Sequence, residues 1–403
     1  MTRGGRAAMI LAGLSLVGYT FYRYGRSTND APPSPGTAAP ASSASAAPAS
    51  TKVRLSFVYG TEKERWLKSA VEAYARRRPD VAIDLKGMGT IESVRAIAEG
   101  RVKPTIWSPA DEIAANLLDT EWSLQKSQPI VERSGDLAPQ PLVLTPLVMI
   151  AWEERAKVMA AAAKGEPTDF RLIHALATNP KGWLGIGGSP EWGYVKPGHT
   201  APSDSNSGLQ TLVLMTYAYH KKRAGLAPAD VLNADFQKWL RELETAVGKF
   251  GSSSGTYMKE MILYGPSKYD LIWNYESVAV SDMAAAQGRW GNLAVYYPRP
   301  TLWSNHPFVF LKGDWVTPEQ KQAALQLREF LLSPEIQARA LEFGFRPANP
   351  DVKIISADPN NPWNKLKPFG LRLDVPAVAE APSGEVTRLL LETWRRVVER
   401  QAR

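Results

Sequence analysis

The sequence predicts an α/β protein built on mainly parallel sheets with helices on both faces. Three observations support this fold class. Short apolar runs alternate with helical patterns over residues 53–118, as in parallel sheets with crossover helices. Small hydroxyl residues stand where the predicted strands give way to helices. Two apolar stretches, 142–152 and 293–300, are punctuated by proline, which favours crossings between domains over central strands.

The composition is that of a globular protein. The 403 residues are 44% hydrophobic and 22% charged, enough for one large domain or two smaller ones. There is no cysteine, which excludes disulfides and thiol chemistry, and the four histidines have no metal-ligand spacing such as HxxxH. We therefore expect neither a metal nor a cofactor. The net charge of +8 is spread without a basic run that interleaves with aromatics, so nucleic-acid binding is not expected.

Residues 1–26 predict a signal anchor or a signal peptide. An apolar run at 7–22 follows Arg3 and Arg6, and it is short for a full membrane span. No small-residue cleavage site stands beside it, and the tyrosines and arginines that follow resemble an interfacial belt. We favour an uncleaved anchor in the cytoplasmic membrane over a cleaved signal. Residues 27–52, rich in Pro, Ala and Ser, predict a flexible tether to an extracytoplasmic body.

The first part of the body is expected to form three strands, each followed by a helix. In such sheets ligands lie beyond the carboxyl ends of the strands, next to helix N-termini. Thr61, Thr90 and Ser108 fall at that edge, where each is either a helix cap or part of a site. The predicted strands are 53–59, 81–85 and 104–108, and the predicted helices are 61–78, 91–99 and 109–118.

The middle of the chain carries a hydroxyl-rich segment, 200–208, directly before an apolar helix at 209–219. Ser205 and its neighbours are the usual helix caps, and the free N–H groups behind them also attract an anion or a polar oxygen. A second polar turn, 252–256, precedes another helix. A strand at 270–276 ends in polar groups, Tyr275 and Glu276. Further helices are expected at 155–164, 170–178, 231–250, 257–264 and 277–287, with a strand at 183–187.

The end of the body is expected to be mainly helical. After a strand at 308–311, Thr317, Pro318 and Gln320 form a capping-box start with proline in the first turn. Further helices are predicted at 317–332, 333–344 and 384–401.

Residues 53 to about 350 resemble the class II periplasmic, or extracellular, solute-binding proteins, which are the receptors of ABC importers. Four places carry the resemblance: 58–64, then 87–90 with 104–108, then 200–208, and the tail 317–347. The central segment is also similar to the binding-protein-like modules that accompany von Willebrand A domains. The DxSxS metal-site sequence of the A domain itself is absent.

The resemblance implies a type II two-lobed fold, in which two α/β lobes joined by two crossover strands close on a ligand. Lobe one is then 53–145 plus 300–403, and lobe two is 146–299. Glu62 and Glu276 depart from relatives that hold oxyanions without counter-charges. If either faces the cleft, a small divalent anion is disfavoured and a neutral or cationic solute is favoured. The ligand-binding residues implied are Thr61, Thr90, Ser108, Ser205, Asn206, Ser207, Tyr275 and Glu276.

Two functions stay open. The first is a membrane-tethered receptor that closes on a small polar solute, such as an oxyanion, for an ABC permease. The second is an envelope sensor or scaffold that uses the same fold with a signalling partner, which the anchor and tether favour. We do not expect an enzyme, because no GxSxG elbow surrounds the serines that follow His199. His199 itself is expected to be a loop histidine bonded to the backbone.

Overall fold

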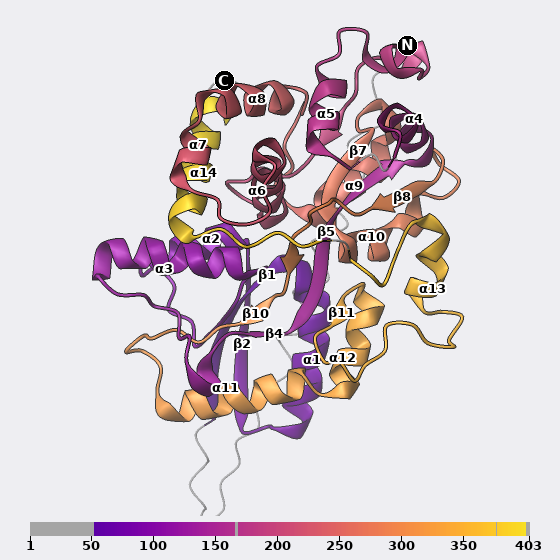
Figure 1. Cartoon of the computed structure of the whole chain (residues 1–403). Coiled ribbons are helices and arrows are strands. Elements are labelled where there is room, and N and C mark those ends of the chain that lie inside the picture. Colours follow the sequence, from indigo (N-terminus) through magenta and orange to yellow (C-terminus); the bar gives the residue numbers. More distant parts are fainter. Residues whose placement is uncertain (1–51, 166–167, 376, 400–403) are drawn as a thin grey trace, which may run out of the picture. The chain divides into compact units, whose positions relative to one another are not determined.

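The structure is a computed structural model, and it describes residues 52–165, 168–375 and 377–399. Two main sheets organise this part of the chain (Figure 1). The predicted anchor at 1–26 and nearly all of the tether lie outside the described residues. Within the described ranges, none of the helices has the length and apolar character needed to cross a membrane.

Lobe one is our name for the part built on the first sheet. Its central strand, β1, lies parallel to both neighbours, and Val53 of β1 stands opposite Val81 of β2. Phe57 on β1 is fully buried and packs edge-on against Phe308, at a ring distance of 5.6 Å. The three predicted strands and the helices after them are confirmed. They are β1 (Val53–Gly60), β2 (Val81–Met88), β3 (Ile106–Ser108), α1 (Glu64–Arg77), α2 (Thr90–Ala98) and α3 (Glu112–Lys126).

Helices from the end of the body complete lobe one. The helix α11 (Pro318–Leu331) contacts β1 and α1, and α12 (Pro334–Ala340) contacts α1. Thr317 and Gln320 form the predicted capping box at the start of α11. Chain segments far apart in sequence therefore share one apolar core.

Lobe two is our name for the part built on the second sheet. Its central strand β5 runs antiparallel to β7 and β8, while β6 is parallel to β7, so this sheet is mixed. The strands are β5 (Val143–Trp152), β6 (Pro197–Gly198), β7 (Leu271–Tyr275) and β8 (Leu293–Tyr296). The helices are α4 (Glu153–Ala163), α5 (Phe170–Ala177), α6 (Asn206–His220), α7 (Pro228–Leu232), α8 (Ala234–Thr245), α9 (Ser254–Tyr264) and α10 (Glu276–Asp282).

The strand β5 connects the two lobes without a break (Figure 1). Its first half pairs with β9 (Trp303–Ser304) and β11 (Arg346–Pro347), and its second half pairs with β7 and β8. Pro146 lies opposite Trp303, where the outgoing and returning chains run side by side. The first proline-punctuated stretch is therefore a crossing, but it is also the continuous central strand of the lobe-two sheet, which the prediction did not expect. The second stretch is not itself the return crossing, because 293–296 forms β8 of lobe two and the returning chain pairs with β5 at 303–304. The returning chain also forms β10 (Pro307–Phe308), which pairs with β4 (Gln140–Pro141).

Several predicted elements differ from the structure. Residues 183–187, predicted as a strand, lie in a 3-10 helix, Gly182–Ile186. The single helix predicted at 231–250 is two, α7 and α8, because Asn233 leaves helical geometry and its side chain caps α8 at the N–H of Phe236. The short helix α13 (Pro362–Leu366) was not predicted from the sequence.

The last described helix, α14 (Gly384–Val397), contacts both lobes. It packs against α3 of lobe one and against α6, α7 and α8 of lobe two. Its apolar stripe, which includes Leu390 and Trp394, joins a core cluster that draws residues from both lobes. The Trp394 indole N–H donates to Glu244 on α8 at 2.9 Å. The predicted C-terminal helix is confirmed, and it contacts both lobes.

Candidate functional site

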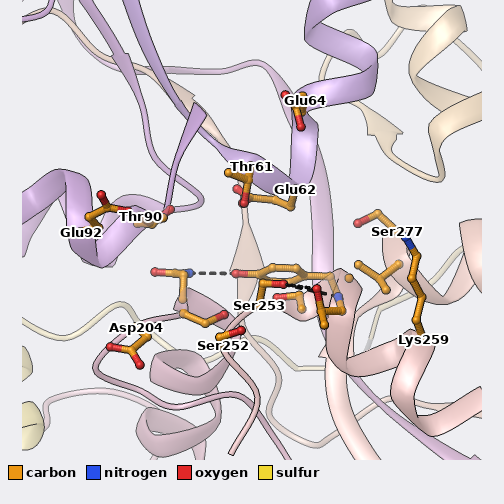
Figure 2. Close-up of a pocket in the computed structure, with 18 of the residues that line it drawn as sticks. Thr61, Glu62, Glu64, Thr90, Glu92, Asp204, Ser252, Ser253, Lys259 and Ser277 are labelled. Atoms are coloured by element: carbon orange, nitrogen blue, oxygen red, sulfur yellow. Dashed lines mark hydrogen bonds between the residues drawn. The ribbon is translucent and has the colours of Figure 1, made fainter. Parts of the chain in front are cut away.

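A cavity of about 660 Å³ lies between the two lobes, and Figure 2 shows many of the side chains that line it. Thr61 and Thr90 come from lobe one, and Ser252 and Ser253 face them from lobe two. The lining is mainly hydroxyl and charged groups, contributed by the first turns of several helices. The cavity therefore stands at the carboxyl ends of the lobe-one strands, as expected for an open α/β sheet.

The lobe-two wall is formed by two helix N-termini. Ser205 occupies the N-cap of α6, yet its side chain makes no capping hydrogen bond. The N-cap of α9 is Ser253, whose hydroxyl accepts from the Thr256 N–H. Ser205 and Ser254, at the starts of these helices, are nearly buried and line the cavity. Both helices thus direct the positive ends of their dipoles at the cavity, which suits a negatively charged or oxygen-rich group.

The lobe-one wall carries a carboxylate, Glu62, whose side chain is 12% exposed. Burial alone would raise the pKa of Glu62, but Lys63 and His306 lower it to about 2. The Lys63 Nζ lies 3.3 Å from the carboxylate and also donates to the Ser108 carbonyl at 2.9 Å. Lys63 is fully buried beneath Glu62 and holds this carboxyl in its ionised form. Glu62 can therefore accept hydrogen bonds from a solute without requiring a cation.

Five of the eight sequence-predicted residues line the cavity, and three do not. Ser108 is fully buried and donates to the His306 carbonyl. Ser207 is fully buried among the hydroxyls of Thr200 and Ser254, at 2.8 Å from each. The five that line it, whose role in binding stays a prediction, are Thr61, Thr90, Ser205, Asn206 and Tyr275.

Glu276 does not face the cleft. It is fully buried and forms two hydrogen bonds of 2.7 Å with the Arg346 guanidinium, and it also accepts from the Tyr297 hydroxyl. The reason is the alternation of side chains at the end of β7, since Tyr275 lines the cavity and its neighbour points to the opposite side. Of the two glutamates that distinguish this sequence from oxyanion-binding relatives, only Glu62 therefore lines the cavity.

Two groups of lining residues were missed at the sequence level. The serines at 252–254 stand at the start of α9, just as Ser205 stands at the start of α6. This repeated pattern of serines at a helix start could have identified them from the sequence. The charged residues carry no such signal, because they lie on helices, or in the turn before α6, that only the tertiary structure brings together. They are Glu64, Arg65, Glu92, Arg95, Asp204, Lys259 and Asp282.

His199 makes the predicted backbone bond, with its Nδ1 2.8 Å from the Thr200 carbonyl. It is nevertheless fully buried, and its Nε2 lies 2.8 Å from the Glu244 carboxylate, so it supports the fold of lobe two rather than a catalytic site. In the ranges that the structure describes, no three His, Cys, Asp or Glu residues gather as a metal site would require.

The His199–Glu244 pair predicts a pH-dependent stability. Burial alone would lower the pKa of His199, but the Glu244 carboxylate and its hydrogen bond raise it above the ordinary value. The stabilisation is fully present below the ordinary pKa of about 6.5 and is lost as the pH rises through the raised pKa. We expect the free energy of unfolding, measured by urea denaturation, to fall as the pH rises above the ordinary histidine pKa of about 6.5. His199→Gln should flatten this slope, whereas His174→Gln at the surface should retain it.

A family model described as bacterial extracellular solute-binding protein matches residues 55–346. A search of curated protein sequences finds no match to this chain.

Solved structures share the fold at low sequence identity. The Actinobacillus pleuropneumoniae periplasmic binding protein AfuA, with exogenous fructose-6-phosphate bound, has a TM-score of 0.56 and 14% identity over 86% of this chain and 99% of its own. A periplasmic thiamin-binding protein has a TM-score of 0.56 and 14% identity, over 86% and 96%. A Trichodesmium protein in complex with iron and citrate has a TM-score of 0.55 and 12% identity, over 85% and 99%.

These likenesses establish the two-lobed α/β fold. The predicted similarity to modules that accompany von Willebrand A domains stays a prediction, since neither the family model nor these structures concern such a module.

Proposed function

Because the chain belongs to the family of bacterial extracellular solute-binding proteins, we propose that it is an extracytoplasmic receptor that closes two lobes on a small polar solute for an ABC importer. The observation that carries the proposal is the cavity between the lobes, which both lobes line with hydroxyl groups. We assign 53–145 plus 300–403 to lobe one and 146–299 to lobe two, with α14 in contact with both. Thr61, Thr90, Ser205, Asn206 and Tyr275 are the proposed ligand-binding residues.

The proposed solute carries an oxyanion group next to hydroxyl groups. The N-termini of α6 and α9 favour the oxyanion group, and the ionised Glu62 favours a hydrogen-bond donor opposite it. A small divalent anion without a proton to donate would be repelled by Glu62. Fructose-6-phosphate, the ligand of the Actinobacillus neighbour, is one molecule with both groups.

A second candidate function is a sensor or scaffold of the envelope that recognises its solute without transport. The predicted uncleaved anchor and the tether at 27–52 favour it, because they would hold the receptor at the membrane. Loss of uptake of the recognised solute in a deletion strain supports the importer role, and unchanged uptake supports the sensor.

A thermal-shift screen of residues 51–403 tests solute binding, because these residues lie within one compact unit and a ligand stabilises only the form that binds it. The screen compares sugar phosphates, hydroxycarboxylates, sulfate, neutral sugars, amino acids and polyamines. We expect stabilisation of about 2.7 kcal/mol at 100 times the dissociation constant, with sugar phosphates or hydroxycarboxylates ahead of sulfate. The absence of a shift with every class contradicts solute binding, and a preference for sulfate contradicts the proposed solute class.

A further inference from the structure

One lysine among the residues that line the cavity has no partner. Lys259, on α9, is exposed and forms neither an ion pair nor a hydrogen bond with any residue that the structure describes. The guanidinium of Arg65, by contrast, lies 5.4 Å from the centroid of the Phe343 ring. Arg95 donates to the Ser203 carbonyl at 2.9 Å. Of the three cations in the lining, the Lys259 ammonium is therefore the one available to an anion.

The Ser277 hydroxyl lies at the same end of the cavity and also lacks a partner. Ser277, on α10, lines the cavity and is 3% exposed, and its Oγ makes no hydrogen bond. The helices α9 and α10 pack against each other, and in Figure 2 the Lys259 side chain extends from its helix toward Ser277. A buried hydroxyl without a partner is rare in folded proteins. Because this hydroxyl makes no bond, turning it toward an oxyanion at Lys259 gives up none.

The opposite end of the cavity is acidic. Glu92 of lobe one and Asp204 of lobe two both approach Gly89, and Figure 2 shows the two carboxylates at the end away from Lys259. The charge of Arg95 offsets part of theirs. Asp204 directly precedes the N-cap of α6, so an anion at that helix start meets a like charge. At α9, the Lys259 side chain instead leans back over the first turns, where the N–H groups are already partly positive.

Asp282 is the internal carboxylate that attracts Lys259. It lies on α10, and the two side chains form no ion pair. Burial raises the pKa of Asp282, whereas the charges of Lys259 and Arg65 lower it. Glu64, on the lobe-one side, is held by Lys68 at 2.6 Å. These carboxylates limit the negative charge that this end of the cavity can accept, which favours a solute with a single oxyanion group over one with several.

We propose that Lys259 and the Ser277 hydroxyl determine the specificity for the oxyanion group, and that the solute is a polyhydroxy compound with one such group, bound between α9 and α10. Its hydroxyl groups then lie toward Glu62 and the acidic end of the cavity. The proposal rests on the proposed function, because it assigns an orientation to the solute of the same cavity.

Inorganic phosphate probes this site before the solute is identified. Isothermal titration of residues 51–403 should show saturable phosphate binding at low ionic strength, where exposed charges are least screened. Lys259→Gln should weaken this binding about tenfold, and Lys259→Arg, which keeps the charge, should retain it. Lys238→Gln replaces an exposed lysine on α8, outside the cavity lining, and should bind as the parent does.

Two further variants separate anion binding from an attraction within the protein. Ser277→Ala should weaken phosphate binding about threefold and leave the melting temperature unchanged, because the hydroxyl makes no bond in the protein. Asp282→Asn should strengthen phosphate binding, because it removes a like charge. Phosphate binding that responds neither to Asp282→Asn nor to Lys259→Gln overturns the proposal and leaves Lys259 as a mere counter-charge of Asp282.

A parent protein that binds no phosphate also overturns the proposal. So does a Lys259→Gln variant that binds phosphate as the parent does, which would leave an adventitious ion only. Failure of the proposed function is a separate result. A thermal-shift screen without any response contradicts solute binding even where phosphate binds at Lys259. A sugar phosphate that stabilises the parent and Lys259→Gln equally contradicts the Lys259 site alone.

Discussion

Arg346→Met is expected to lower the free energy of unfolding by about 3–5 kcal/mol, because it leaves the Glu276 carboxylate buried without its cation. The two side chains are joined by two hydrogen bonds of 2.7 Å, and Glu276 is fully buried. The guanidinium also donates to the carbonyls of Arg372 and Leu373, at 2.6 Å each. The substitution therefore leaves a buried charge unpaired, and it also removes the hydrogen bonds that hold the backbone at 372–373.

Chemical denaturation of residues 51–403 measures this effect, and the chain offers matched controls. Arg388→Met breaks an exposed pair with Glu392 on α14 and should cost less than about 0.5 kcal/mol. The double variant Arg346→Met with Glu276→Met removes both charges and should recover much of the loss. An Arg346→Met variant that unfolds like Arg388→Met would show that water reaches Glu276.

We expect Ser205→Ala to weaken solute binding and Ser207→Ala to lower the free energy of unfolding. Ser205 lines the cavity, and its hydroxyl makes a long contact of 3.4 Å with the Ser207 hydroxyl. Its loss should weaken binding of the solute found in the screen about tenfold and leave the unliganded melting temperature nearly unchanged. Ser207→Ala instead leaves the buried hydroxyls of Thr200 and Ser254 without a partner, so it should lower the free energy of unfolding by about 1–3 kcal/mol.

Isothermal titration of each variant with that solute, beside its thermal melt, provides the two readouts. The hypothesis for Ser205 is wrong if its alanine variant binds like the parent protein but melts as low as Ser207→Ala. That outcome would give both serines a structural role at the start of α6.

The order of strands and helices could be predicted from local sequence patterns. The runs that become β1, β2 and β3 alternate with helical patterns of apolar residues, and each pattern involves only residues close together in the chain. The crossing at 142–152 was predicted from its proline, although this strand is also central in the lobe-two sheet, whereas the stretch at 293–300 ends just before the return crossing. The prediction of one helix at 231–250 was wrong, because apolar residues stand on both sides of Asn233 and hide the break between α7 and α8.

The candidate site was predicted less completely, and the errors have one cause. Ser205 and Ser207 are equally polar and two residues apart, yet one lines the cavity and the other is buried against Thr200. Glu276 follows a lining residue and instead meets Arg346, which is 70 positions away in the chain. No local pattern distinguishes these outcomes, because each depends on which distant segment packs against the residue.

The sequence by itself determined the α/β class, the capping box of α11, the first crossing and the hydroxyl-rich helix starts, since these depend on the chemistry of neighbouring residues. The tertiary structure decided which of those hydroxyls face a common cavity, and it placed Lys63 beneath Glu62 and Asp111 against α6. Burial and charge pairing between segments far apart in the chain set these outcomes. They govern protonation and hydrogen bonding in the proposed site, because a buried charge is costly unless another segment supplies its partner.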